Sequence, residues 1–445
     1  MKFVRWLYPG IGVKRWLLVF TAGIFLLGVG IAMAIDPTAL MAIETAITEI
    51  ASTRQQVSTV RAGMVLAVAG GALTLVALQS IIRNVYQAAV PRGGESLGKL
   101  LFSRRNLERG PRIVAIGGGT GLSVLLRGLK EFTGNLTAVV TVSDDGGSSG
   151  RLRQELGILP PGDIRNCLLA LADTEPLMER LFQYRFKEGS GLAGHNFGNL
   201  FIAALTDVTG DFEEAVRESS KVLAVRGKVL PTTLQNVTLS AELEDGRQVR
   251  GETAISGATS RIRRLYLDPP DPEPLPEVLA AIREADAIVL GPGSLYTSVV
   301  TNLLVPGITQ AIRESRALKI HVLNIMTQPG ETPSYRASDH VLALLRDAGQ
   351  DCVEVVVANS QQVPADVTAR YTAQGSRPVE VDEKNLANLG VALVQEQLAA
   401  WDGGVVRHSP EKLARCLWRV ILAHRGAAIR QRLIEMYTSP EKAKG

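Results

Sequence analysis

The stretch Ile113-Val114-Ala115-Ile116-Gly117-Gly118-Gly119-Thr120-Gly121 decides the fold class of this chain. Its apolar, partly β-branched start predicts a short buried strand, and the apolar run after Gly121 predicts a helix. Glycines at such a junction let the backbone approach a phosphate group, and the helix N-terminus supplies free N–H groups that bind it. Because the stretch is neither a Walker loop nor a strict GxGxxG motif, a simple tight turn is the alternative.

Short apolar runs alternate with helical segments on both sides of this stretch. The runs that look like buried strands are 112–116, 136–142, 286–290, 319–324 and 353–358. This alternation predicts an α/β fold, a Rossmann-like doubly wound and mostly parallel sheet.

Three further segments predict local structure outside the sheet. Residues 236–254 alternate apolar and polar side chains around Asp245-Gly246, which predicts a small antiparallel β insertion. The five prolines of residues 268–277 predict a stiff loop rather than a helix. Ser409-Pro410-Glu411 is typical of a helix start, with a cap, a first-turn proline and an early acid.

A polar loop, Ser143 to Arg151, follows the second expected strand. Asp144 or Asp145 lies at about the distance from Gly121 at which dinucleotide-binding folds place an acid on a ribose. The same two carboxylates could instead hold a magnesium ion, and Arg151 could pair with a phosphate. The alternative for this loop is a solvated turn with no ligand.

Two helix starts carry further polar side chains. Asp163 begins a helix after Pro160-Pro161-Gly162 and is either a cap or a functional acid. Asn196 and Asn199 precede an apolar helical run, 200–206, and offer amide groups suited to a base or a sugar. His195 beside them is either a general acid/base or a structural histidine.

A second glycine-bearing strand end, Gly291-Pro292-Gly293-Ser294, follows the strand at 286–290. Polar residues from Asn324 to Gln328 end the next strand. Open α/β sheets bind ligands at the carboxyl edge of their strands, so these ends and the first glycine stretch predict one crevice. Ordinary turns are the alternative for both.

Composition excludes several classes of protein. Hydrophobic residues make up 46% and charged residues 21%, which is typical of a globular chain and not of a disordered one. The three cysteines are far apart, which argues against a disulfide scaffold or a cysteine-rich zinc site. Residues 1–110 hold 12 Lys and Arg against 5 Asp and Glu, so the excess of positive charge lies in the N-terminal region. It gives no reason to expect that the main domain binds nucleic acid.

Two uncharged apolar runs, 16–35 and 62–82, are each long enough to span a bilayer as a helix. Basic residues flank their outer ends, which predicts that both termini are cytoplasmic and that the protein is a multi-pass cell-membrane protein. A signal peptide ending near Ala32-Met33-Ala34, or two buried core helices, are the alternatives. The expected organisation is a membrane anchor at 1–82, a basic juxtamembrane linker at 83–111 and the Rossmann-type domain at 112–440.

The chain resembles the gluconeogenesis factor family, the YvcK-like branch of the CofD-like superfamily. The motifs that carry the resemblance are IVAIGGGTGLSVLLRGL, TAVVTVSDDGGSSGRLR, PPGDIRNCLLALA, GHNFGNL, ADAIVLGPGSLYTSV and NIMTQPGET, in order within about 111–437. The related 2-phospholactate transferases have a pattern like GPSNP where this chain has Gly291-Pro292-Gly293-Ser294-Leu295-Tyr296. The branch often has Arg-His-Asp near the C-terminus, whereas this chain has Arg407-His408-Ser409.

The resemblance implies a site for a nucleotide or nucleotide sugar and a role in cell shape and envelope synthesis during growth on gluconeogenic carbon sources. The ligand expected first is a UDP-sugar, UDP-N-acetylglucosamine above all, bound without turnover and with no required cofactor. The ligand-binding residues expected from the motifs and the resemblance are Gly118, Gly119, Thr120, Gly121, Ser143, Asp144, Asp145, Arg151, Asn196, Asn199, Gly291, Gly293, Ser294 and Arg407. No catalytic residue is assigned. A homo-oligomer and regulatory proteins of envelope synthesis are the protein partners left open.

Two enzymatic alternatives remain at this point. One is a phosphotransferase of the 2-phospholactate transferase type, which would use magnesium at Asp144 and Asp145. The other, a dinucleotide-dependent oxidoreductase, lacks a recognisable hydride-transfer site and ranks last.

Overall fold

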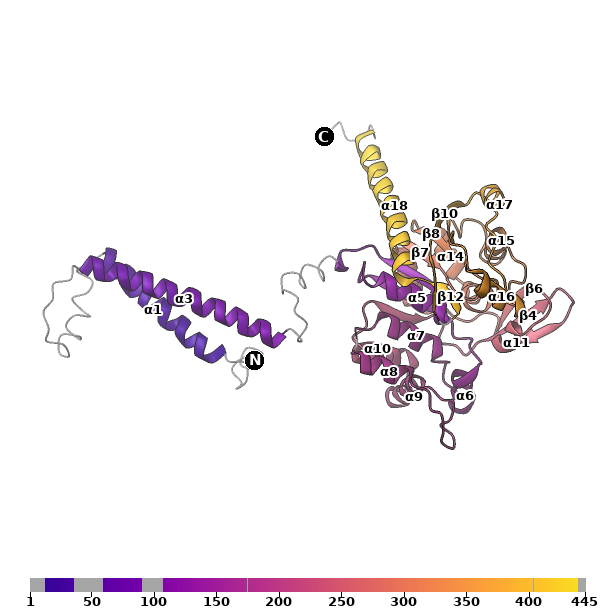
Figure 1. Ribbon diagram of the computed structural model, residues 1–445, viewed down its shortest axis with the longest axis horizontal. Coiled ribbons are helices and arrows are strands. Elements are labelled where there is room, and N and C mark those ends of the chain that lie inside the picture. The colour runs from indigo at the N-terminus through magenta and orange to yellow at the C-terminus, as the bar shows by residue number, and fades with distance from the viewer. Residues whose placement is uncertain (1–12, 36–58, 90–106, 174, 403, 439–445) are drawn as a thin grey trace. The chain divides into compact units, whose positions relative to one another are not determined.

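The computed structural model describes residues 13–35, 59–89, 107–173, 175–402 and 404–438 (Figure 1). It divides into two compact units, Met1–Ser103 and Arg104–Gly445. Most of the basic residues expected to set the membrane orientation, and most of the expected linker, lie outside the described residues.

The first unit is a pair of apolar helices, α1 (Val13–Ile35) and α3 (Thr59–Ala89). The segments long and apolar enough to cross a membrane are Arg15–Ala34 and Arg61–Ile81, close to the two expected spans. Glycines let the helix backbones touch: a Cβ at position 30 would lie 2.3 Å from the Ala67 nitrogen, and one at position 70 would lie 2.4 Å from the Leu27 nitrogen. Small residues of this kind are common where membrane helices pack together.

The second unit is built on a seven-stranded parallel sheet with the order β10-β9-β8-β7-β1-β2-β3. This confirms the expected fold class. Ile113 on the central strand pairs with Leu136 on one side and Ala287 on the other. The strands are β1 (Ile113–Gly117), β2 (Leu136–Val140), β3 (Lys228–Pro231), β7 (Ala287–Leu290), β8 (Leu318–Val322), β9 (Val355–Asn359) and β10 (Ala392–Glu396).

Helices cover the sheet in two groups. Near the first strands, α18 packs on α5, and α5 packs on α7. Near β7 and β8, α12 packs on α14 and η3 packs on α15. Their bounds are α5 (Gly119–Leu129), α6 (Gly147–Leu156), α7 (Gly162–Leu171), α8 (Pro176–Gln183), α9 (Phe197–Thr209), α10 (Phe212–Val222), α12 (Pro276–Glu284), η3 (Leu295–Val300), α13 (Thr301–Leu303), α14 (Ile308–Glu314), α15 (Ala337–Ala348), α16 (Ala365–Ala373), α17 (Glu383–Asn388) and α18 (Pro410–Thr438).

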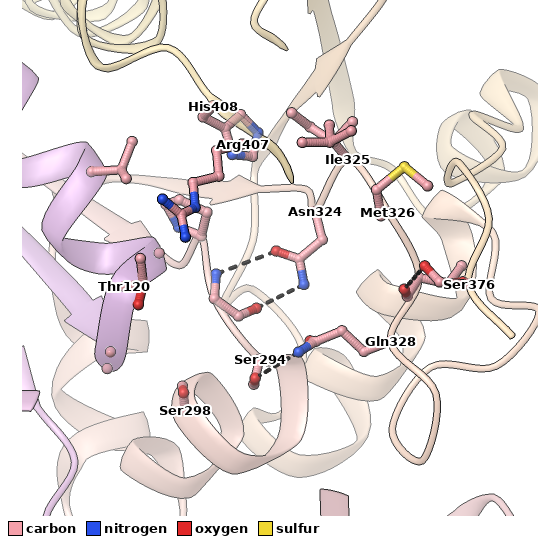
Figure 2. A pocket seen from close by; sticks show the side chains of 18 of the residues that line it. Thr120, Ser294, Ser298, Asn324, Ile325, Met326, Gln328, Ser376, Arg407 and His408 are labelled. Atoms are coloured by element: carbon pink, nitrogen blue, oxygen red, sulfur yellow. Dashed lines mark hydrogen bonds between the residues drawn. The ribbon is translucent and has the colours of Figure 1, made fainter. Parts of the chain in front are cut away.

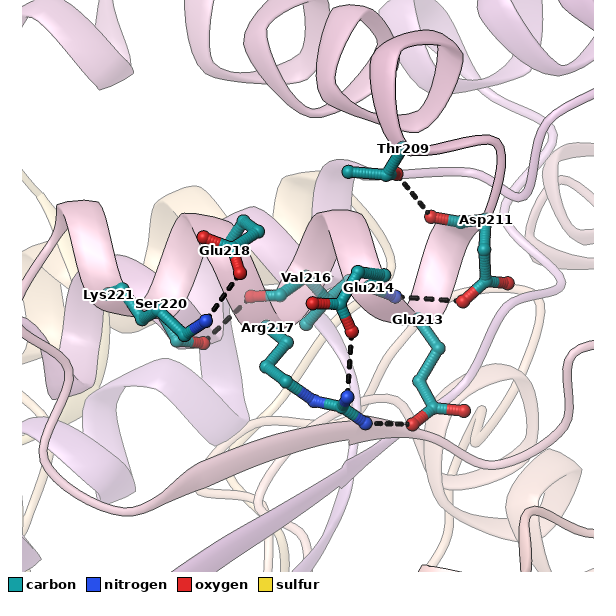
Figure 3. A network of polar contacts seen from close by, with 9 residues as sticks. All are labelled: Thr209, Asp211, Glu213, Glu214, Val216, Arg217, Glu218, Ser220 and Lys221. Atoms are coloured by element: carbon teal, nitrogen blue, oxygen red, sulfur yellow. Dashed lines mark hydrogen bonds and ion pairs between the residues drawn. The ribbon is translucent and has the colours of Figure 1, made fainter.

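Helix α10 shows how local chemistry sets an element's bounds (Figure 3). Gly210 ends α9 in the left-handed conformation, and the Asp211 side chain accepts a hydrogen bond of 2.9 Å from the Glu214 nitrogen. Arg217 then pairs with Glu213 and Glu214 on the exposed face. The cap satisfies an N–H group that the first turn leaves unpaired, so it fixes where the helix begins.

The antiparallel insertion is a three-stranded sheet with the order β5-β4-β6. Its strands are β4 (Thr238–Leu243), β5 (Gln248–Arg250) and β6 (Ile262–Asp268), and β4 and β5 flank the expected turn at Asp245-Gly246. Two local expectations were wrong. Residues 252–254 belong to a short helix, α11 (Glu252–Ser256), and not to the hairpin. The proline-rich segment 268–277 is not a loop throughout, because Pro276 is the first residue of helix α12.

A second hairpin, β11 (Ala399–Asp402) and β12 (Val405–His408), precedes α18. The expected helix start at 409–411 is confirmed, since α18 begins at Pro410. Helix α18 crosses α5 closely at Gly128, where a Cβ would lie 2.1 Å from the Pro410 carbonyl oxygen. The hairpin is therefore held against the first strand–helix unit of the sheet, and it brings Arg407 to the carboxyl edge of the strands.

Candidate functional site

A cavity of about 500 Å³ lies where the chain reverses its direction of travel across the sheet, between β1 and β7. In open α/β folds, ligands bind in the crevice that forms at this point. Both glycine-bearing strand ends line it, together with residues after β8 and on β12. The lining residues expected from the sequence are Gly118, Gly119, Thr120, Gly121, Gly293, Ser294 and Arg407.

The first glycine loop presents backbone to the cavity at the start of α5. Gly119 has a φ of +60°, in the left-handed region that glycine adopts without strain. A Cβ at position 118 would lie 2.6 Å from Asp163 Oδ2, so the loop also approaches α7 closely. The N-cap residue of α5 makes no side-chain cap; the Gly119 N–H faces the Asp163 carboxyl group, and the N–H groups after it are available to an anion.

The second glycine loop packs directly on the first. A Cβ at position 121 would lie 2.5 Å from the Pro292 carbonyl oxygen and 2.7 Å from the Gly293 Cα. The Asn324 side chain holds this loop from the other side: its Oδ1 accepts from the Gly293 nitrogen at 3.3 Å and its Nδ2 donates to the Gly293 oxygen at 2.7 Å. Gln328 Nε2 donates to Ser294 Oγ at 2.9 Å (Figure 2).

Arg407 is the cationic side chain among the lining residues. Figure 2 shows it pointing into the cavity between Thr120 and Asn324. It is exposed, and it makes no ion pair or hydrogen bond with the side chains of the described residues around the cavity. Its neighbour His408 is buried, and burial lowers the pKa of that imidazole to about 4, so it stays neutral beside the arginine.

Two acidic side chains, Asp163 and Glu252, also line the cavity. The N-cap residue of α7 is Pro161, so Asp163 lies inside the first turn and does not cap the helix through its side chain. Burial, together with the nearby Asp144 carboxylate, raises the pKa of Asp163 to about 7. Burial and surrounding carboxylates raise the pKa of Glu252 to about 9.

The Asp-rich loop lies beside the cavity rather than in its lining. Ser143 pairs with Thr141 at 3.0 Å, and Asp144 Oδ1 accepts from the Gly146 nitrogen at 2.9 Å. Asp145 Oδ1 accepts from both the nitrogen and the hydroxyl group of Thr253. Asp144 and Asp145, both expected to contact a ligand, thus each have one carboxylate oxygen that accepts from a backbone nitrogen of the protein.

The expected asparagines have similar internal roles. Asn196 caps α9 by accepting from the Asn199 nitrogen at 3.2 Å. Asn199 Oδ1 accepts from Arg165 at 3.0 Å, and Asn199 Nδ2 donates to Ser149 Oγ at 3.4 Å. Arg151 donates to the Ala193 oxygen at 3.1 Å. Neither these three residues nor Gly291 belongs to the cavity lining, so their contact with a ligand stays a prediction.

The carboxylates of Asp144 and Asp145 face different neighbours. Asp145 turns toward Gly251, where a Cβ would lie 2.1 Å from its Oδ2, whereas Asp144 turns toward Gly146 and Gly162. In the described part of the chain, no three His, Cys, Asp or Glu side chains gather closely enough to hold a metal ion. Magnesium binding by these two carboxylates stays a prediction of the transferase alternative.

Sequence reasoning passed over Glu252 entirely. It sits in a segment whose alternating pattern predicted a strand, and no local signal sets it apart from the exposed acids of the insertion. Asn324 and Gln328 were recognised only as polar residues at a strand end. Their function of clamping the second glycine loop depends on a contact with residues more than thirty positions away.

Comparison with known proteins gives consistent results. The family model described as "2-phospho-L-lactate transferase CofD" matches residues 113–399. A putative gluconeogenesis factor of a Nostoc species is 47% identical over 94% of this chain and 92% of its own length. The gluconeogenesis factor of Bacillus subtilis is 52% identical over 69% of this chain and 97% of its own. A crystal structure of a UPF0052 family member from Bacillus halodurans is 51% identical, with a TM-score of 0.67 over 68% of this chain and 98% of the other.

Proposed function

The chain belongs to the gluconeogenesis factor family within the wider CofD family, and on that premise we propose that it is a membrane-tethered regulator that binds a nucleotide sugar. The ligand is a UDP-sugar of the UDP-N-acetylglucosamine type. Binding it makes the protein a regulator of cell shape and envelope synthesis during growth on gluconeogenic carbon sources.

One observation carries the binding part of this proposal. The two glycine loops meet backbone to backbone at the crevice between β1 and β7, and an unpaired arginine points into the space beside them. Uncapped N–H groups at the start of α5 and a guanidinium group are both donors that recognise phosphate oxygens. Asn324, Thr327, Gln328 and Ser376 add neutral donors and acceptors suited to hydroxyl and amide groups.

Calorimetric titration of the full chain in detergent with UDP-N-acetylglucosamine tests the proposal. Binding should be saturable in EDTA, and Arg407→Gln should weaken it at least about tenfold, since a charge-assisted hydrogen bond is lost. Arg217→Gln removes the same charge from α10, whose Arg217 pairs with Glu213 and Glu214 away from the cavity, and it should bind like the wild type. Absence of saturable binding by the wild type would refute the proposal.

The transferase alternative is favoured by the description of the matching family model. It predicts consumption of the ligand or transfer of its phosphoryl-linked group to an acceptor alcohol in the presence of magnesium. Chromatography of the ligand after long incubation with the protein and magnesium distinguishes the two functions. We expect intact UDP-sugar, and turnover that needs Asp144 or Asp145 would establish the enzyme.

The membrane part of the proposal rests on the two apolar helices of the first unit. We propose that they span the cell membrane with both chain termini in the cytoplasm. When fused after Gly445, a reporter that works only in the cytoplasm should be active, and a reporter that works only outside the cytoplasm should be inactive.

The regulatory part of the proposal is tested in cells that lack the gene. There the wild-type chain should restore growth and shape on a gluconeogenic carbon source, whereas the Arg407→Gln chain should not.

A further inference from the structure

The antiparallel insertion contributes one side chain to the cavity, the carboxyl group of Glu252. It stands at the first position of α11, which follows β5. Gly251 before it has a φ of +95°, and a Cβ there would lie 2.1 Å from Asp145 Oδ2. The chain therefore passes tightly over the Asp-rich loop before it places Glu252 near Asp163, in the lining of the cavity that Gly118 and Gly119 also line.

Both ends of α11 are fastened to loops of the main sheet. At its start, Thr253 donates to Asp145 Oδ1 from its nitrogen at 2.9 Å and from its hydroxyl group at 2.7 Å. At its end, Ser256 Oγ donates to Glu331 Oε1 at 3.3 Å. Glu331 is itself buried and accepts from the Tyr296 nitrogen at 3.0 Å. The position of Glu252 is thus set by loops that follow β2 and β8.

The Glu252 carboxyl group has an oxygen with nothing to pair with. Oε2 is buried and has no hydrogen-bond partner among the described residues. The charged groups that face it are all acids: Asp163 from α7, Asp144 and Asp145 from the loop after β2, and Glu331 from the loop after β8. Burial and these neighbours hold the pKa of Glu252 near 9, so the group is a neutral carboxylic acid at pH 7.

A neutral carboxylic acid is a hydrogen-bond donor, and an ionised one is only an acceptor. The first glycine loop beside Glu252 is where an anion would meet the N-terminus of α5. An ionised Glu252 there would repel a phosphate group, whereas a neutral one can donate to it. The unpartnered oxygen, its burial and its place in the cavity that Gly118 and Gly119 also line all suit a hydrogen-bond donor.

We propose that Glu252 is a specificity-determining residue of the nucleotide-sugar site, and that its neutral carboxyl group donates a hydrogen bond from Oε2 to a phosphate oxygen of the ligand. Asp145 is then a positioning residue that acts through α11, and not a ribose ligand. This inference rests on the proposed function, because it assigns a role within the same cavity.

Glutamine at position 252 keeps the shape and a donor but does not ionise, so Glu252→Gln is the decisive variant. Titrations of the full chain in detergent use UDP-N-acetylglucosamine in EDTA between pH 6 and pH 10. At pH 7, Glu252→Gln should bind within about threefold of the wild type, and Glu252→Ala should bind at least about tenfold more weakly. The matched control is Glu244→Gln, an exposed acid of the same insertion, which should bind like the wild type.

The pH profile separates Glu252 from its neighbour Asp163. Ionisation of Asp163 should weaken binding near pH 7 in both the wild type and Glu252→Gln. Above pH 8 the wild type alone should lose a further tenfold or so as Glu252 ionises, since each pH unit above a pKa lowers the protonated fraction tenfold. At pH 8, where Asp163 is largely ionised, the infrared carbonyl absorption of protonated acids should be weaker in Glu252→Gln than in the wild type.

Three results would overturn the inference. The first is binding by Glu252→Gln as weak as that by Glu252→Ala, which would mean that the carboxylate itself, or a cation on it, is needed. The pH profiles of the wild type and Glu252→Gln could coincide above pH 8. The double variant Asp145→Ala/Glu252→Ala could bind more weakly than the wild type by the product of the two single-variant effects, which would make Asp145 an independent contact. If the wild type binds no UDP-sugar, the proposed function fails and this inference fails with it.

Discussion

The contact between the two glycine loops leads to a pair of substitutions that should lower stability by different amounts. At Gly121, the Cβ of alanine would lie 2.5 Å and 2.7 Å from backbone atoms of Pro292 and Gly293, so the second loop must move away. Overpacking of this kind costs about 1–3 kcal/mol. At Gly119, the nearest atom to a new Cβ is Asp163 Oδ1 at 3.5 Å, an ordinary contact. The cost there is the left-handed conformation, about 1–2 kcal/mol, less about 0.4–1 kcal/mol regained by restricting the unfolded chain.

The new methyl group at position 119 stands where a phosphate would touch the backbone. Gly119→Ala should therefore lower the free energy of unfolding by only about 1 kcal/mol and weaken UDP-N-acetylglucosamine binding at least about tenfold. Gly121→Ala should lose more stability than Gly119→Ala, because its neighbours are backbone atoms that cannot rotate away. Valine at position 119 is a poorer probe, since a β-branched residue adds strain at a φ of +60°. Urea unfolding and calorimetric titration give the two quantities. If Gly119→Ala loses as much stability as Gly121→Ala and still binds the ligand, the first loop is a tight turn and not a phosphate site.

Three further predictions follow from other parts of the chain. The pKa of Asp163 is raised in the folded state to about 7, so the contribution of its protonated carboxyl group to folding stability is fully present below about pH 4 and is lost as the pH rises through 7. Asp163→Asn should therefore be more stable than the wild type by up to about 4 kcal/mol at pH 8 and by almost nothing at pH 4. If the urea midpoints of the two proteins differ equally at both pH values, this reasoning is wrong. Asp211→Ala should lose about 1 kcal/mol with the α10 cap, while Arg217→Gln, which breaks only exposed ion pairs, should stay within about 0.5 kcal/mol in the same assay. Residues 104–445 alone should be soluble and show one cooperative calorimetric transition; an aggregated or molten product would place the domain boundary elsewhere.

Much of the fold was predictable from the sequence because its signals are local. The β-branched run at 113–116 is buried on both faces of the sheet, and the glycines after it mark its end. The runs at 286–290 and 319–324 differ from β7 and β8 by at most two residues at either end. Parallel strands share a carboxyl edge, so the sequence placed the loops at 118–121 and 291–294 on one edge of the sheet, and the pairing of β1 with β7 brings them together.

The polar side chains of the site were harder to predict, because one chemical group serves several purposes. The carboxylate of Asp145 suits a ribose as well as it suits the Thr253 nitrogen, and only the folded insertion determines which one it meets. Asn196 carries the same amide whether it binds a sugar or caps α9. Glu252 gave no signal because its burial depends on Asp145 and Glu331, which are distant in sequence.

The register of the insertion bears on how ligand preference could diverge among relatives. Thr238 at the start of β4 lies opposite Asp268 at the end of β6, so the segment between them leaves and rejoins the main domain at adjacent points. A segment with neighbouring ends can be exchanged as a cassette, because its replacement demands no change in the path of the surrounding chain. Exchange of residues 238–268 would swap the acid at position 252 while both glycine loops stayed in place. New selectivity in this architecture could then arise by recombination of one short module, with the parallel sheet inherited unaltered.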